Sequence, residues 1–80
     1  MTIDQIKRAI IEQILEVAPD VEEDEIVPNE NIQRSLEIDS FDFLNVLTAL
    51  HVQLGVEVPE ADYGKVDTLE HMADYFDKRL

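Results

Sequence analysis

The stretch LEIDSFD at residues 36–42 joins a polar connection to a run of apolar residues. Asp39 is a favoured N-cap residue, and Asp42 adds negative charge to the first turn of a helix, where the helix dipole favours it. The sequence therefore predicts a helix that begins just after Asp39 and ends near Leu54. Ser40 would lie at the positive end of this helix, where free backbone N–H groups can stabilise an attached phosphate.

Two further main helices are predicted from apolar residues that recur at helical spacing. One spans residues 3–17 and begins with a capping box at Thr2. The other spans residues 68–78, where Asp67 and Glu70 offer a second capping box. The expected apolar stripe of this last helix consists of Leu69, Met72, Ala73, Phe76 and Leu80.

The central helix is expected to bury a broad apolar face and to end at Gly55 as its C-terminal cap. Residues 56–58 form an extended linker in this interpretation, because a lone strand has no partner. Pro59 can begin a short helical turn, which Gly64 is expected to break. The buried face is predicted to comprise Phe43, Leu44, Val46, Leu47, Leu50 and Leu54.

A long connection covers residues 18–38 and opens with an acidic run at residues 20–25. The run lacks the glycine and the alternating oxygen ligands of a calcium loop, so we interpret it as solvated. A short helical turn is expected at residues 32–36, and the connection is expected to be held to the core by Ile26, Val27, Ile32, Leu36 and Ile38. The predicted fold is all-α: a small four-helix bundle of three main helices and one short helix, in a single domain over residues 1–80.

The amino-acid composition restricts the partners and cofactors that the chain is expected to bind. The chain has 6 basic and 19 acidic residues and a formal net charge of −13, so nucleic acids and anionic membranes are unfavourable partners, whereas basic patches on proteins are favourable ones. There is no cysteine for a disulfide or a thiolate metal site. No segment is apolar enough for a membrane span or a secretion signal. We expect a monomer in the cytoplasm.

Few residues could perform chemistry. The residue types of a Ser/His/Asp catalytic triad are present, with Ser40, His51, His71 and several carboxylates. However, the sequence has no glycine-flanked serine of the kind found at the nucleophile turn of hydrolases. The two histidines are too far apart in sequence for a helical metal pair, and no metal site is predicted. A serine at a helix start most often only assists capping, so Asp-Ser alone is a weak signal.

Several motifs together are a stronger signal than the Asp-Ser pair alone. Over almost its full length the chain resembles the acyl carrier proteins, which are phosphopantetheine-binding carrier domains. Residues 36–42 are similar to the attachment motif of that family, usually Leu-Gly-x-Asp-Ser-Leu-Asp. The sequence GVEVP at residues 55–59 resembles the segment after the second helix, and DTL at residues 67–69 resembles the start of the last one.

The resemblance implies that Ser40 carries 4′-phosphopantetheine, donated from coenzyme A by a phosphopantetheinyl transferase. Asp39 and Asp42 would orient the transferase and its cation. The arm would hold an acyl group as a thioester and deliver it to acyl-loading and acyl-processing enzymes of fatty acid, polyketide or related specialised biosynthesis. The chain itself would not be an enzyme.

Three departures from the family pattern are visible. Glu37 replaces the common glycine, and Phe41 replaces the common leucine. Carrier proteins of general fatty acid synthesis usually have an acid-rich second helix, but this one has no acid between Asp42 and Glu57. We expect a docking face that is more apolar than charged, suited to a dedicated partner and formed by Phe41, Asn45, Thr48 and Val52.

Three alternatives stay open at the level of sequence. The chain could carry an aminoacyl or peptidyl group, as in nonribosomal peptide pathways. It could be an unmodified, carrier-like interaction module whose Phe41 and Val52 are covered by a partner. A hydrolase that uses His51 or His71 is the weakest interpretation.

Overall fold

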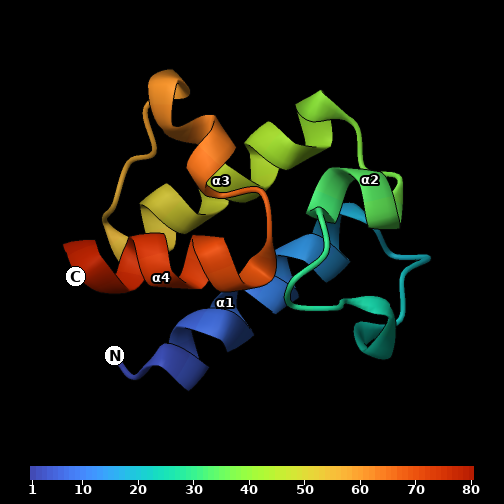
Figure 1. The fold of residues 1–80 in the computed structure, drawn as a ribbon, viewed down its shortest axis with the longest axis horizontal. Helices are drawn as coiled ribbons and strands as arrows, with labels where there is room; N and C mark the ends of the chain where they lie inside the picture. The colour runs from blue at the N-terminus through green and yellow to red at the C-terminus, as the bar shows by residue number, and fades with distance from the viewer.

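Three long helices form the body of the computed structural model, which describes residues 1–80 (Figure 1). The helices are α1 (Ile3–Val17), α3 (Ser40–Leu54) and α4 (Leu69–Arg79). The short elements are α2 (Ile32–Leu36) and two 3-10 helices, η1 (Glu23–Glu25) and η2 (Glu60–Lys65). The structure is therefore all-helical, as predicted, and none of its helices has the length and apolar character that crossing a membrane requires.

The core lies where α1 packs against both α3 and α4. A single cluster of 19 buried apolar residues joins the helices, and each fully buried aliphatic or aromatic side chain contributes about 1.5–3 kcal/mol. The largest fully buried side chains include Phe76, Ile6, Ile10, Ile14, Leu50 and Met72. Because these residues recur at helical spacing, the sequence dictates which side of each helix faces inward.

The long connection between α1 and α3 is fastened to the helices at several points. Arg8 of α1 donates two hydrogen bonds to the Glu23 carboxylate, at 2.8 and 2.7 Å, and this contact lowers the pKa of Glu23. The Ile32 N–H donates to the Asp67 carbonyl at 2.8 Å, and the Glu70 N–H donates to the Pro28 carbonyl at 3.0 Å. These contacts place α2 beside the start of α4 and fix the approach to α3.

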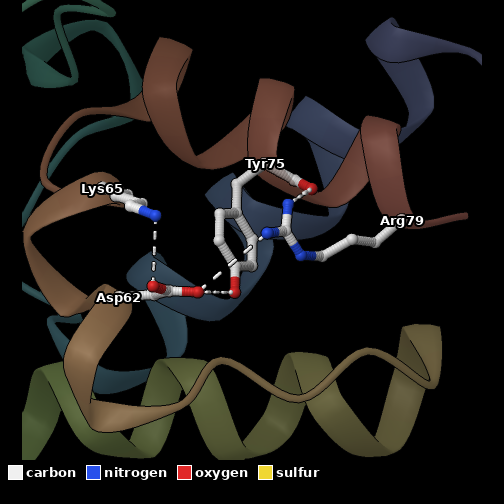
Figure 2. A network of polar contacts seen from close by, with 4 residues as sticks. All are labelled: Asp62, Lys65, Tyr75 and Arg79. Atoms are coloured by element: carbon white, nitrogen blue, oxygen red, sulfur yellow. Dashed lines mark hydrogen bonds and ion pairs between the residues drawn. The ribbon is translucent and has the colours of Figure 1, made fainter.

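A polar network centred on Asp62 attaches η2 to α4 (Figure 2). The Tyr75 hydroxyl donates to Asp62 Oδ2 at 2.7 Å, and Lys65 Nζ lies 3.3 Å from Asp62 Oδ1. The Arg79 guanidinium lies over the Tyr75 ring, 3.5 Å from its centroid, and donates to the Tyr75 carbonyl at 3.2 Å. Since no residue of η2 is fully buried, these polar contacts are a main attachment of η2 to the bundle.

Most element boundaries agree with the sequence. Helix α1 has the predicted bounds and the predicted Thr2 capping box, and Gly55 caps α3 with a left-handed φ of 76°. The predicted turns at residues 32–36 and after Pro59 are present as α2 and η2.

Five details of the sequence analysis were wrong. The N-cap of α4 is Thr68, whose hydroxyl accepts from the His71 N–H at 3.0 Å, rather than Asp67. Helix η2 continues through Gly64, since a 3-10 turn tolerates glycine there. Leu44 was expected in the core but is 40% exposed, because it lies at the edge of the apolar face. Two other expected core residues, Val27 and Leu80, are also exposed.

Candidate functional site

Ser40 is the first residue of α3, and its position follows from the Asp39 cap. The Asp39 carboxylate accepts from the Asp42 N–H at 2.8 Å, and the Asp39 carbonyl accepts from the Phe43 N–H at 3.0 Å. Ser40 is exposed, and its hydroxyl has one neighbour in the chain, the Gln33 amide nitrogen at 3.5 Å. A contact at that distance is weak, so an approaching enzyme can reach the Ser40 oxygen.

The surroundings of Ser40 suit a covalently attached phosphate diester. The Ser40 and Phe41 N–H groups, the first two of α3, have no acceptor within the chain. These groups and the helix dipole favour an anion at this end of α3, by about 0.3–1 kcal/mol. The Asp39 and Asp42 carboxylates flank Ser40 and repel a phosphate, so we expect an attached arm to extend away from the protein surface.

Glu37 lies three residues before Ser40 in a left-handed conformation, with φ 55° and ψ 42°. It ends α2, and the following N–H, that of Ile38, donates to the Gln33 carbonyl at 3.0 Å. Helices commonly end in this way, and glycine is favoured at the left-handed position because it has no Cβ. The backbone conformation thus explains the glycine of the family motif, and Glu37 adopts this conformation at a cost in conformational free energy.

The predicted docking residues share one exposed face of α3. Phe41 is 72% and Val52 is 83% exposed, and Asn45 and Thr48 lie exposed between them. Leu44, which the sequence analysis placed in the core, adjoins this face.

The two histidines are separated from Ser40. His51 lies eleven residues further along α3, which corresponds to about 16 Å of helix. The His71 ring pairs with Asp67 at 2.7 Å on α4. The structure therefore does not bring together a serine, a histidine and a carboxylate as nucleophilic catalysis requires.

A sequence model of the family described as "Phosphopantetheine attachment site" matches residues 8–76. The chain belongs to the acyl carrier protein family. An acyl carrier protein of Rubrobacter xylanophilus is 31% identical over 72 residues, which cover 86% of this chain and 89% of that protein. An acyl carrier protein of Zymomonas mobilis is 29% identical over 77 residues, covering 96% of this chain and 92% of that protein. An acyl carrier protein of Thermosynechococcus vestitus is 26% identical over 74 residues, which cover 89% of this chain and 91% of that protein.

As an acyl carrier protein, the chain is a carrier and not an enzyme, and its cofactor is 4′-phosphopantetheine. The thiol of this cofactor supplies the thioester chemistry that a polypeptide without cysteine lacks. Members of the family interact with a phosphopantetheinyl transferase and with biosynthetic enzymes. This confirms the family, the cofactor and the carrier role that the sequence motifs indicated.

Two features near the site were missed by the sequence analysis. Gln33 was not recognised as a neighbour of Ser40, because only the left-handed turn at Glu37 brings α2 back toward the start of α3. A hollow of about 110 Å³ lies beside α3 and is lined by Leu44, Leu47, Thr48, His51, Glu57, Val58 and Tyr63. No sequence pattern indicates a hollow whose walls come from three separate segments.

Proposed function

We propose that Ser40 is the residue that carries the 4′-phosphopantetheine arm, and that the chain uses the arm to deliver an acyl thioester to biosynthetic enzymes. The observation that carries the proposal is the exposed Ser40 hydroxyl at the first position of α3, beside two free backbone N–H groups. The hydroxyl oxygen forms the new phosphodiester bond to the phosphopantetheinyl group of coenzyme A. The hydroxyl proton is lost, and the adenosine bisphosphate portion of coenzyme A leaves.

Asp39 and Asp42 have different parts in this proposal. The Asp39 side chain is used as the α3 cap, so its first task is to hold Ser40 at the helix start. The Asp42 carboxylate makes no ion pair in the chain, and its N–H is the donor to Asp39. It is therefore available, together with the outer oxygen of Asp39, to orient a cation held by the transferase.

The names of the relatives bear on the chemical class of the cargo. The relatives above are named acyl carrier proteins, which favours an acyl group over an aminoacyl or peptidyl group. We propose that the enzymes served belong to fatty acid, polyketide or related specialised biosynthesis. A tethered thioester is held at high effective concentration at any enzyme that docks the carrier, which is what such pathways require. A monomeric state and a cytoplasmic location stay predictions from the sequence.

In vitro loading tests the role of Ser40. The purified chain is incubated with coenzyme A and a broad-range phosphopantetheinyl transferase, and its intact mass is measured. We expect the mass of one phosphopantetheinyl group to be added to the wild type and to Ser35→Ala, and not to Ser40→Ala. Ser35 is the matched control because it is the other serine of the chain and is also exposed. Undiminished loading of Ser40→Ala would refute the assignment.

A further inference from the structure

The one side chain that contacts the Ser40 hydroxyl is that of Gln33, and it comes from a different helix. Gln33 is the second residue of α2, seven residues before Ser40, and its amide nitrogen lies 3.5 Å from Ser40 Oγ. The Gln33 side chain forms no other hydrogen bond within the chain. Its amide is therefore a polar group that faces the modification site and has only a weak partner there.

The backbone of Gln33 is held on both sides, so its side chain starts from a fixed point. On one side, the neighbouring Ile32 is buried and its N–H donates to the Asp67 carbonyl at 2.8 Å. On the other side, the Gln33 carbonyl accepts from the N–H of the buried Ile38 at 3.0 Å. The left-handed Glu37 turns the chain back toward α3. Because these contacts fix the backbone, only the side-chain rotamer of Gln33 remains to be ordered when it binds a group at the start of α3.

Attachment of phosphopantetheine changes what the Gln33 amide faces. Phosphorus is then bonded directly to Ser40 Oγ, so the free oxygens of the phosphodiester lie close to the position of the present hydroxyl group. These oxygens share a negative charge, and a hydrogen bond to a charged acceptor is shorter and stronger than one to a hydroxyl. A rotation of the flexible Gln33 side chain can turn the 3.5 Å contact into such a bond.

An uncharged amide suits this place better than a cation does. A cation beside Ser40 would pair with the carboxylates of Asp39 and Asp42, whereas an amide stays free for the phosphate. The nearest cation along the chain is Arg34. It lines a separate hollow with Glu30, and adjacent residues of a helix do not face the same way. The amide is therefore the side-chain donor of α2 that is directed at the modification site.

We propose that Gln33 is a positioning residue of the modified protein, whose side-chain amide donates to the phosphodiester on Ser40 and fixes the direction in which the prosthetic arm leaves the surface. Together with the free N–H groups at the start of α3, the amide offsets the repulsion from Asp39 and Asp42. The arm then begins beside α2 instead of rotating freely about the Ser40 side chain, and its distal part extends into solvent. The proposal rests on the assignment of Ser40 above and adds the group that holds the phosphate.

A thermodynamic cycle between loading and substitution tests the contact. Wild type, Gln33→Ala and Gln33→Glu are each unfolded in urea before and after loading with phosphopantetheine. We expect loading to lower the unfolding equilibrium constant about three- to tenfold more in wild type than in Gln33→Ala. In Gln33→Glu, which keeps the shape but replaces the donor with a negative charge, loading should be less favourable still. A purely structural role of Gln33 would change the stability of the unloaded protein and leave the effect of loading unaltered.

A second measurement uses the wild type alone. In NMR spectra of the side-chain amides, loading should move the Gln33 amide protons downfield, because a hydrogen bond to a charged oxygen is a strong one. The amides of Gln5, Gln13 and Gln53 are internal controls in the same spectrum. Arg34→Gln is the matched control variant for the cycle, since it removes the neighbouring cation of α2 and should keep the wild-type effect of loading.

The outcomes separate the positioning role from the assignment of Ser40. A Gln33 amide that does not move on loading would overturn the positioning role alone. The same holds for effects of loading that agree within about twofold between wild type and Gln33→Ala, or for an effect that is lost in Arg34→Gln instead. Absence of loading in the wild type would overturn the assignment of Ser40, and the positioning role with it.

Discussion

Replacing Tyr75 with phenylalanine removes one oxygen atom and tests how η2 is held to α4. The Tyr75 hydroxyl donates to Asp62 at 2.7 Å, and Tyr75 is buried. A hydrogen bond to a charged group contributes about 1.5–3 kcal/mol. The lower figure applies here, because Lys65 and Arg79 remain near the Asp62 carboxylate, at 3.3 and 4.0 Å. The stacking of Arg79 on the ring does not need the hydroxyl.

We therefore expect Tyr75→Phe to lower the free energy of unfolding by about 1.5 kcal/mol. A domain of this size changes its Tm by about 4–8 °C per kcal/mol, so the expected loss is about 6–12 °C. Urea denaturation at neutral pH, followed by circular dichroism, measures the change in the free energy of unfolding. Tyr63→Phe is the matched control, since the polar contacts of this network join Asp62, Lys65, Tyr75 and Arg79 and do not include Tyr63. A loss for Tyr75→Phe no larger than that of Tyr63→Phe would refute the account of the network.

The pH dependence provides a second readout of the same variant. The hydrogen bond from Tyr75 lowers the pKa of Asp62 below its ordinary 3.8, with help from Lys65 and Arg79. Because the pKa of Asp62 is lower in the folded state than in the unfolded state, Asp62 contributes to the free energy of unfolding above about pH 4. This contribution is lost as the pH falls through the folded-state pKa. Burial and Asp62 raise the pKa of Tyr75 above 10, so Tyr75 contributes to the free energy of unfolding below pH 10, and this contribution is lost above it. Both losses should be smaller in Tyr75→Phe than in wild type.

Two further substitutions test the elements around the site. Glu37→Gly is expected to stabilise the fold by about 0.5–1 kcal/mol, because glycine adopts the left-handed conformation of this residue without strain. The control is Glu37→Gln, which removes only the charge and should raise the free energy of unfolding by less in urea denaturation. Equal increases for the two variants would contradict the backbone explanation. Thr68→Ala is expected to cost about 1–2 kcal/mol, since it removes the α4 cap. If Asp67→Ala proved the more costly of the two in the same assay, the assignment of the α4 cap would be wrong.

The helices of this protein are largely predictable because local rules determine them. The Thr2 capping box, the Asp39 cap and the left-handed Gly55 are each decided by residues within one turn. The motif around Ser40 could therefore be located from the sequence, together with its place at the start of α3.

Contacts between distant segments explain what the sequence analysis missed. Two adjacent residues, Asp67 and Thr68, can both cap α4, and the structure uses Thr68 because the Asp67 carbonyl is engaged by the Ile32 N–H. The Asp67 side chain pairs with His71 instead. In the same way, the pairing of Tyr75 with Asp62 joins residues that are 13 apart. No periodicity within one helix indicates such pairs.

We propose that Ser40 anchors the prosthetic arm in the cell, and peptide mapping of the native protein tests this most directly. Trypsin is expected to release residues 35–65 as one peptide, because cleavage follows Arg34 and Lys65. This peptide contains both serines, and fragmentation mass spectrometry of protein isolated from its native cell locates any modification within it. We expect a phosphopantetheinyl group on Ser40, with or without an acyl thioester at its end. Native protein that carries the group on any other residue, or that never carries it, would contradict the assignment of Ser40.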